Sequence, residues 1–374
     1  MVSELATGRR MVKSFSVLHA NPEGGRMILL LSRLTARKFV RRAGPIILCV
    51  VWGAHAVNIG WFSPPIVRAE DFAVAKSPSE YGFGLSKDDA QQGWIALFDG
   101  SSGFGWSDAK VESGVLDAGK TSTRFVSGLL RGESTAAGEL LFGDRVLSVP
   151  QGEFEIDAVS SSATHLILKP GLRLKRIAFR PLKLRPIFDG KSLEGWSRIR
   201  HSKLPSERQA KWRIDERTIR AIGGPGAIEY RERYDDFFLQ VAFRCRKELV
   251  NAGIFFRAVP GEFLNGYEAQ VFNACEAGDA ARPVRFSTGA IDDRQLARRL
   301  VSRDNETTVM TIVADGRHLS TWVNGYQVVD WIDTRASHPN PRIGCSVNQG
   351  VIQLQAHDQQ TDIEFSDVSI TDLF

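Results

Sequence analysis

The feature that most constrains this fold is an alternation of apolar and polar side chains with a period of two. In residues 237–246, Leu239, Val241, Phe243 and Cys245 fall on one face of an extended segment. Similar runs at 308–313, 318–323 and 326–331 are separated by Asp-Gly at 315–316 and Asn-Gly at 324–325. These dipeptides favour the positive φ angles of two-residue hairpins, so the pattern predicts an antiparallel meander. Only residues 292–302 suggest a helix, and the many short strands predict an all-β, two-sheet sandwich.

An internal repeat divides the chain. Residues 95–106 and 185–196 share Phe-Asp-Gly and Gly-Trp in one register, and each copy predicts an apolar strand, an Asp-Gly turn and a returning Trp. Only the second copy is followed by a full-sized domain. We therefore predict a linker at 70–91, a small β module at 92–183 that opens with a degenerate repeat, and a main domain at 184–374. We expect the module to pack against its neighbour or to contact carbohydrate.

The first 69 residues are typical of a targeting leader. They hold ten Lys and Arg against two acidic residues, and a basic stretch at 33–42 directly precedes an apolar run at 45–62. This order predicts a signal peptide with its basic end inside, and the small residues before Glu70 suit cleavage. The alternative is an uncleaved membrane anchor, because the run approaches spanning length. We expect an exported chain, periplasmic or extracellular, that meets a membrane only through residues 45–62.

The rest of the chain is slightly acidic, with 38 Lys and Arg against 41 Asp and Glu. The overall charge of +5 therefore belongs to the leader, and no nucleic-acid partner is expected. Cys245, Cys275 and Cys345 are odd in number and lack metal-site spacing, so they predict no zinc site and do not identify a disulfide pair.

Polar side chains of an unusual kind share a phase on three predicted strands, at 253–258, 266–273 and 351–357. On each strand the opposite face is apolar. The polar set is Arg257, Glu268, Gln270, Gln353, Gln355 and His357. These groups bond hydroxyls with fixed direction, which favours a concave sheet face that binds a sugar, although an ordinary solvated face is the alternative. Trp322, and Tyr267 or Phe272 at the rim, are candidates to stack on a sugar ring.

Seven motifs are spread over residues 184–374: FDGKSLEGW at 188–196, NAGIFFR at 251–257, GYEAQ at 266–270, TGA at 288–290, WVNG at 322–325, LQAH at 354–357 and IEF at 363–365. Together they resemble the 3-keto-disaccharide hydrolase domain family. The resemblance implies a concanavalin A-like jelly-roll sandwich and hydrolase or lyase action on 3-keto-glycosides in exported bacterial carbohydrate metabolism. The chain departs from the family at Asn273, where an acidic residue is common. We retain Asn273 as a substrate-binding candidate.

A 3-keto sugar can be cleaved by elimination, because the ketone acidifies the neighbouring C2 hydrogen. The reaction needs a base, an acid for the leaving oxygen, and a cation or donors for the enediolate. By type, His357 suits the base or acid, Glu268 its complement and Arg257 the charge stabiliser. Gln270 and Gln355 suit hydroxyl recognition. The alternatives are a structural imidazole at His357 and a buried ion pair between Glu268 and Arg257.

Three functions follow as hypotheses. The first is an exported enzyme that cleaves 3-keto-glycosides. The second is a non-catalytic carbohydrate-binding module of the same fold, since fold alone does not fix activity. The third is a cell-surface scaffold. No cofactor or metal is expected, because no His, Asp or Glu spacing demands one, although sandwiches of this type can hold calcium.

Overall fold

The computed structural model describes residues 51–52, 55–56 and 72–373, and it divides the chain into units at 1–66 and 67–374. In the first unit, β1 (Val51–Trp52) pairs with β2 (His55–Ala56). The predicted leader at 1–69 and anchor at 45–62 otherwise lie outside the described residues. Within the described part of the chain, no helix has the length and apolarity needed to cross a membrane.

The second unit contains a β-sandwich, as the alternation predicts. Its larger sheet runs in the order β15-β16-β26-β18-β22-β23-β24, with β13 also paired to β26. Apart from β13, its neighbouring strands are linked by consecutive antiparallel ladders. The strands are β13 (Arg185–Pro186), β15 (Lys211–Asp215), β16 (Thr218–Ile222), β18 (Phe237–Cys245), β22 (Thr308–Asp315), β23 (His318–Val323), β24 (Tyr326–Ile332) and β26 (Asp362–Asp372).

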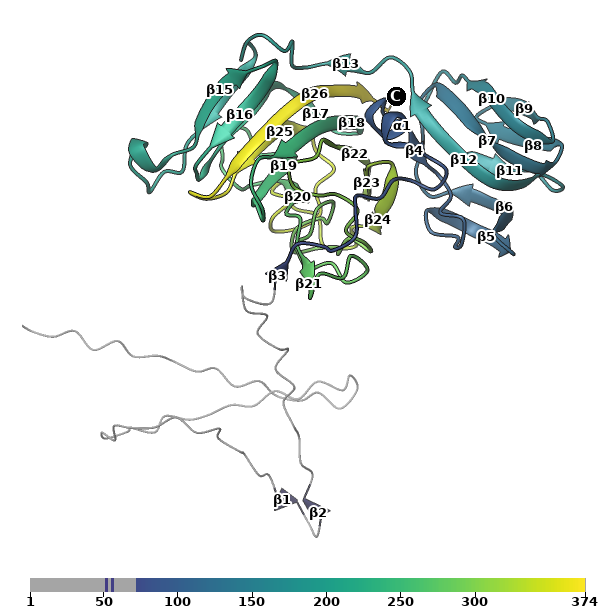
Figure 1. Ribbon diagram of the computed structural model, residues 1–374, viewed down its shortest axis with the longest axis horizontal. Coiled ribbons are helices and arrows are strands. Elements are labelled where there is room, and N and C mark those ends of the chain that lie inside the picture. The colour runs from purple at the N-terminus through teal and green to yellow at the C-terminus, as the bar shows by residue number, and fades with distance from the viewer. Residues whose placement is uncertain (1–50, 53–54, 57–71, 374) are drawn as a thin grey trace, which may run out of the picture. The chain divides into compact units, whose positions relative to one another are not determined.

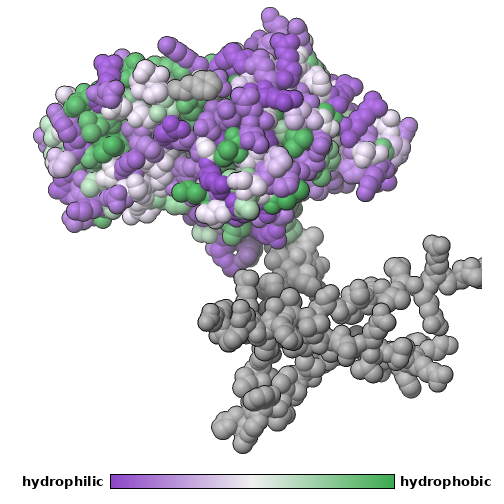
Figure 2. Space-filling model, turned by 180° about the vertical axis from the view of Figure 1, so that it is seen from behind, coloured by the Kyte–Doolittle hydropathy of each residue, from purple (hydrophilic) through white to green (hydrophobic). Residues whose placement is uncertain are grey.

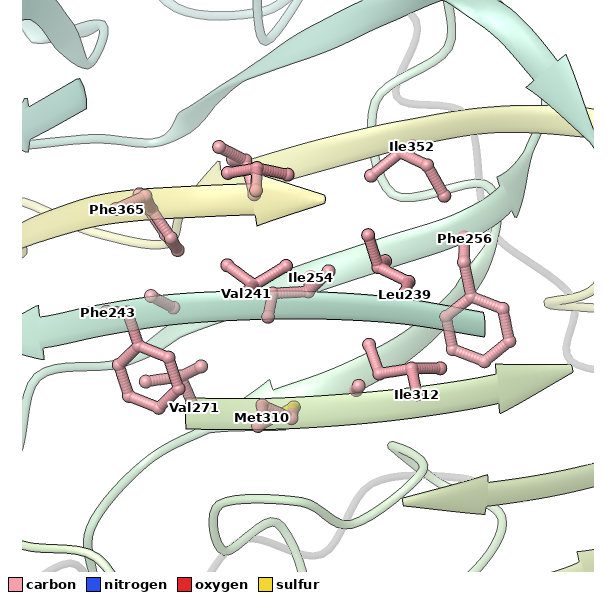
Figure 3. Packing of buried hydrophobic residues seen from close by; sticks show 14 of the residues in the cluster. Leu239, Val241, Phe243, Ile254, Phe256, Val271, Met310, Ile312, Ile352 and Phe365 are labelled. Atoms are coloured by element: carbon pink, nitrogen blue, oxygen red, sulfur yellow. The ribbon is translucent and has the colours of Figure 1, made fainter. Parts of the chain in front are cut away.

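The smaller sheet has the order β14-β17-β25-β19-β20 and faces the larger one. Its strands are β14 (Trp196–Ile199), β17 (Gly226–Tyr234), β19 (Ala252–Ala258), β20 (Tyr267–Val271) and β25 (Gly350–Ala356). Apolar side chains from both sheets interlock between them, with Leu239 and Ile312 on the larger sheet and Ile254 and Ile352 on the smaller (Figure 3). This core leaves the other face of the smaller sheet free for polar groups.

Residues 95–181 form a separate antiparallel sheet of nine strands beside the sandwich (Figure 1). Its order is β10-β7-β12-β6-β11-β8-β9, with β4 on β12 and β5 on β6. The strands are β4 (Ile95–Ala96), β5 (Trp106–Glu112), β6 (Val115–Thr121), β7 (Gly128–Ala136), β8 (Gly138–Phe142), β9 (Arg145–Val149), β10 (Gly152–Ala158), β11 (Leu166–Leu168) and β12 (Arg173–Pro181). The prediction of an all-β chain, with a smaller β module ahead of a jelly-roll sandwich, is confirmed.

This module covers part of the outer face of the larger sheet. Phe238, Val313 and Trp322 point away from the sandwich core and join the apolar cluster of the module. A hydrogen bond also joins the module to the larger sheet, since the hydroxyl oxygens of Thr123 and Ser320 lie 2.9 Å apart. The surface of the unit is otherwise mostly hydrophilic in the view of Figure 2, with apolar residues in small separate patches.

The two Phe-Asp-Gly segments form the same local structure. Trp106 Nε1 donates to the carbonyl of Leu97, and Trp196 Nε1 donates to the carbonyl of Ile187, nine residues back in both cases. In each copy the Asp carboxylate accepts the backbone N–H groups two and three residues later, which closes the turn.

Residues 72–91, predicted as a linker, instead pack along the folded unit. They contain β3 (Phe72–Ala73), which pairs with β21 (Cys275–Glu276), and α1 (Lys87–Gln91). Arg303 donates to the carbonyls of Ser77 and Pro78. We call residues 72–80 the N-terminal strap, since these contacts hold them to the loops of the sandwich.

The helix predicted at 292–302 is absent: these residues form turns and isolated bridges. Their backbone groups bond other segments, with Arg298 N donating to Val328 O and Leu300 N to Ala280 O. These tertiary contacts replace the internal ladder of a helix. The only helices among the described residues are α1 and a 3-10 turn, η2 (Ser206–Arg208).

Candidate functional site

The strand register brings the predicted polar groups onto one face of the smaller sheet. Gly253 is the registered partner of both Gln355 and Gln270, on either side of it. One row further along, Phe255 is paired with Gln353 and Glu268. Opposed residues of an antiparallel pair share a face. Because Gly253 has no side chain, the centre of the row that contains both glutamines is open to the side chain of Glu268.

A pocket of about 310 Å³ opens above this row. Its lining residues come from β20, from the end of β25 and from the neighbouring loops. They are Asn251, Leu264, Glu268, Gln270, Phe286, Asp292, Arg342, Gln355 and His357. The structure therefore brings together Glu268, Gln270, Gln355 and His357, which the sequence pattern singled out.

Glu268 has the most perturbed environment in the pocket. Its side chain is only 4% exposed, and burial raises the pKa of its carboxyl to about 8, with the nearby charge of Asp292 adding to the shift. Arg342 opposes the shift, since its Nη2 lies 2.7 Å from Glu268 Oε2. At neutral pH the carboxyl is therefore mostly protonated and can act as a proton donor.

Arg342 links two carboxyl groups of the pocket. Its Nη1 donates to Asp292 Oδ2 at 2.7 Å, and its Nε donates to the carbonyl of Leu264 at 3.0 Å. Neither Arg342 nor Asp292 was predicted as a site residue. Both lie in loops that carry no strand pattern, and Arg342 is 74 residues from Glu268 in the chain, so no local spacing indicated their meeting.

The two pocket glutamines differ in what they can offer a ligand. Gln270 Nε2 donates to Asn251 Oδ1 at 2.6 Å and to the carbonyl of Ala252 at 3.2 Å, which leaves its Oε1 as an acceptor. Gln355 is 1% exposed, and neither of its amide atoms has a hydrogen-bond partner among the described residues. Unpaired buried amides are costly, so a ligand hydroxyl that pairs with Gln355 gains binding energy.

His357 lies at the mouth of the pocket, directly after β25. Its Nδ1 is 3.1 Å from Asp358 Oδ2, and its side chain is about half exposed. No hydrogen bond joins the imidazole to Glu268 among the contacts of the described residues.

Arg257, predicted as the charge stabiliser, lies elsewhere. A register shift between Phe255 and Ala258 and a φ of 45° at Arg257 break the alternation of β19, so its side chain leaves the polar row. The guanidinium is buried and donates to the carbonyls of Asp235 (2.6 Å), Gly316 (2.6 Å) and Ser346 (2.9 Å). It also pairs with Asp236, so its role is structural.

The remaining predicted binding residues are also structural. Asn273 lies beyond the end of β20, where it is 1% exposed and bonds Asp304, Thr288 and Ser302. Trp322 is buried against the module and donates from Nε1 to the carbonyl of Ala96. Tyr267 points into the sandwich core and donates to Asp333 Oδ2 at 2.6 Å, while Phe272 packs behind the pocket wall on Phe286.

No cysteine lines this pocket. Cys245, Cys275 and Cys345 are buried free thiols. Among residues 72–373, no group of His, Cys, Asp or Glu side chains is arranged to hold a metal ion. The Glu268 and Asp292 carboxyls of the pocket are instead bridged by Arg342.

A larger hollow of about 490 Å³ lies on the module, but four of its five charged residues are already paired with each other. Arg131 bonds Asp89 at 2.7 Å and Arg176 bonds Glu153 at 3.0 Å. Satisfied ion pairs of this kind offer little to a ligand, so the pocket of Glu268 and His357 is the stronger candidate site.

A comparison with known protein families gives a carbohydrate-related match. A family model described as 3-keto-alpha-glucoside-1,2-lyase-like domain matches residues 183–371. No curated protein matches the chain. A solved "putative glycosyl hydrolase" of Parabacteroides distasonis is 16% identical with a TM-score of 0.39, over 50% of this chain and 93% of that one. The carbohydrate-binding module CBM66 of Bacillus subtilis is 15% identical with a TM-score of 0.34, over 48% and 96%.

Proposed function

Since the chain belongs to the family of 3-keto-alpha-glucoside-1,2-lyase-like domains, we propose that its pocket cleaves 3-keto-glycosides by elimination and hydration. The observation that carries this proposal is the shared pocket of Glu268, His357, Gln270, Gln355 and Arg342. It combines a protonated carboxyl, an imidazole and a cation, which are the parts that elimination next to a ketone requires.

The first step removes the C2 hydrogen of the 3-keto sugar. The imidazole of His357 takes the proton, and the electrons of the C2–H bond move into an enediolate on C2, C3 and the C3 oxygen. Arg342 and the amide of Gln355 are the donors near which this negative charge develops. Arg342 takes the role first assigned to Arg257, because Arg342 lines the pocket and Arg257 does not.

The second step breaks the bond between C1 and the glycosidic oxygen. The enediolate reforms the ketone, its electrons make a C1–C2 double bond, and the leaving oxygen takes the proton of Glu268. The raised pKa of Glu268 keeps that proton available at neutral pH. Water then adds its oxygen to C1 and a proton to C2, which yields the free 3-keto sugar and restores both groups.

The proposal is tested by incubating the chain with 3-keto-sucrose and 3-keto-trehalose and following products by mass spectrometry. We expect wild type to release fructose from 3-keto-sucrose and glucose from 3-keto-trehalose. Turnover should fall about 100-fold or more in Glu268→Gln and in His357→Ala. Unmodified sucrose and trehalose serve as controls, because without the ketone the C2 hydrogen is not acidic. Wild-type turnover that survives both substitutions would exclude this mechanism.

The second candidate function is carbohydrate binding without catalysis. The observation in its favour is the geometry of His357, whose one polar contact among the described residues is with Asp358. The unpaired amide of Gln355 suits a binding site equally well. Recovery of intact 3-keto-disaccharide from a complex that binds it would favour this function over the first.

We also propose that the chain acts outside the cytoplasm. The support is the order of basic and apolar residues in the leader, with the run at 45–62 serving as a signal or an anchor. Fractionation of cells that express the full chain, with and without residues 1–69, tests the proposal.

A further inference from the structure

A second pocket lies beside the first at the same end of the smaller sheet. Its volume is about 310 Å³, and it is formed by the end of β14, the start of β17 and β15, and the loop at 200–210. Ala227 lines this pocket and is the registered partner of Gln355, which lines the first. Neighbouring strands are about 4.8 Å apart, so Ala227 of the second pocket and Gln355 of the first lie one strand spacing apart.

The register at the ends of β17 and β25 also relates the two pockets. Gly226, in the second pocket, is paired with Ala356, the residue before His357. The turn that begins at His357 is fixed to the loop of the second pocket, since Gln359 Nε2 donates to the carbonyl of Arg208 at 2.9 Å. The second pocket therefore borders the ends of β17 and β25, where His357 lines the first pocket.

The second pocket is positively charged. Its lining includes Arg198, Arg200 and Lys211 and contains no acidic residue. Among the described residues, none of the three forms an ion pair, whereas Arg213 and Arg220 of the adjoining hairpin both pair with Asp215. Unpaired cations around one concave site favour an anionic group.

The frame of this pocket is ordered by hydrogen bonds. Arg198 Nη2 donates to the carbonyl of Trp212 at 3.0 Å, which ties β14 to β15. The amide of Gln209 closes the loop, accepting from His201 N and donating to the carbonyls of His201 and Leu204, at 2.8 to 2.9 Å. Arg200 and Lys211 are exposed, and no hydrogen bond among the described residues engages their side chains.

We propose that this second pocket binds a negatively charged substituent, a carboxylate or a phosphate, on the part of the substrate that leaves from C1. The inference rests on the proposed function, because the first pocket must hold the 3-keto ring. It makes the substrate class an anionic 3-keto-glycoside rather than a neutral disaccharide.

The experiment compares the full chain with Arg200→Gln/Lys211→Gln on 3-keto-sucrose with and without a phosphate on the fructosyl unit. We expect wild type to show a KM at least about tenfold lower for the phosphorylated substrate, and the double variant to lose that preference with kcat unchanged. Lys203→Gln is the matched control, since Lys203 lies in the same loop but does not line the pocket. It should keep the full preference.

Binding measurements identify the preferred anion, and they test the second pocket separately from the proposed catalysis. Isothermal titration with glucuronate, glucose 6-phosphate and glucose distinguishes carboxylate from phosphate as the preferred group. Equal affinity for all three, or a preference lost in Arg342→Gln and kept in the double variant, would overturn the second site. If the wild-type chain does not cleave 3-keto-sucrose, but its preference for an anion is lost in the double variant, the anion site stands and the proposed catalysis is rejected.

Discussion

Gly253 makes room for the carboxyl of Glu268. A Cβ atom on Gly253 would lie 2.3 Å from Glu268 Oε1, far inside van der Waals contact. Gly253 has an ordinary strand backbone, so its lack of a side chain, and not its flexibility, is what the pocket uses. The carboxyl of Glu268 extends over β19 because Gly253 places no side chain there.

Gly253→Ala should therefore displace the carboxyl and reduce turnover of 3-keto-sucrose by about 10- to 100-fold. The measurement is kcat at saturating substrate, with thermal unfolding to show that the fold remains. Glu268→Asp in the same chain withdraws the carboxyl from the added methyl group and should restore part of the loss. Full activity in Gly253→Ala alone would contradict the placement of Glu268.

The raised pKa of Glu268 predicts a pH dependence of both activity and stability. The folded pKa of about 8 is above the value of 4.5 for an exposed glutamate, so between these pH values the native chain holds a proton that the unfolded chain has released. The free energy of unfolding should therefore fall as pH rises through this window. Activity should fall as the acid loses its proton above a pH of about 8.

Glu268→Gln provides the test of the stability effect, because it keeps the shape of the side chain and removes the titration. Unfolding midpoints measured at intervals from pH 5 to 9 should decline more steeply in wild type than in this variant. Parallel curves would show that the carboxyl is ionised in the native chain at neutral pH.

The fold could be predicted from the sequence because its signals are local. Alternation identified the faces of β18, β19, β20 and β25, and the Asp-Gly and Asn-Gly turns identified the meander of β22, β23 and β24. The phase of the polar and apolar alternation was enough to indicate Glu268, Gln270, Gln355 and His357 as site residues. The same rule failed at Arg257, since a bulge reversed the phase within one strand.

Other parts of the site depended on tertiary contacts that the sequence does not reveal. Arg342 reaches Glu268 from a loop without periodicity, and no residue spacing links the two. Trp322 looked available for sugar stacking, because no residue pattern indicated which face of the sheet the module would cover. The strap resembled a linker because its contacts are to loops far along the chain.

Substitution of Arg257 should affect stability, whereas substitution of Arg342 should affect turnover. Arg257→Gln removes a buried guanidinium with four polar partners and should lower the free energy of unfolding by about 3 to 5 kcal/mol. Arg342→Gln should change stability little, because Arg342 is partly exposed, but should reduce turnover by about 100-fold. Denaturant titration and kcat on each variant check both parts. If Arg257→Gln remains well folded but has a strongly reduced kcat, Arg257 takes part in the mechanism after all.

The strap should position the pocket wall through Phe72. Its ring meets Phe272 and Phe286 edge-on at 5.9 Å and 5.5 Å between centroids, and Phe286 lines the pocket. Phe72→Ala should raise KM about 5- to 10-fold and leave kcat nearly unchanged, because it loosens the wall without touching the reacting groups. Phe72→Leu should recover most of the affinity by refilling the space.

Phe83→Ala is the control for this last prediction. Phe83 lies just beyond the strap and makes a similar edge contact with Phe98, but it is 42% exposed and does not line the pocket. KM measurements on 3-keto-sucrose for the three variants separate a local effect from general loosening of this segment. If Phe83→Ala raises KM as much as Phe72→Ala does, the contact between Phe72 and Phe286 is not what shapes the pocket.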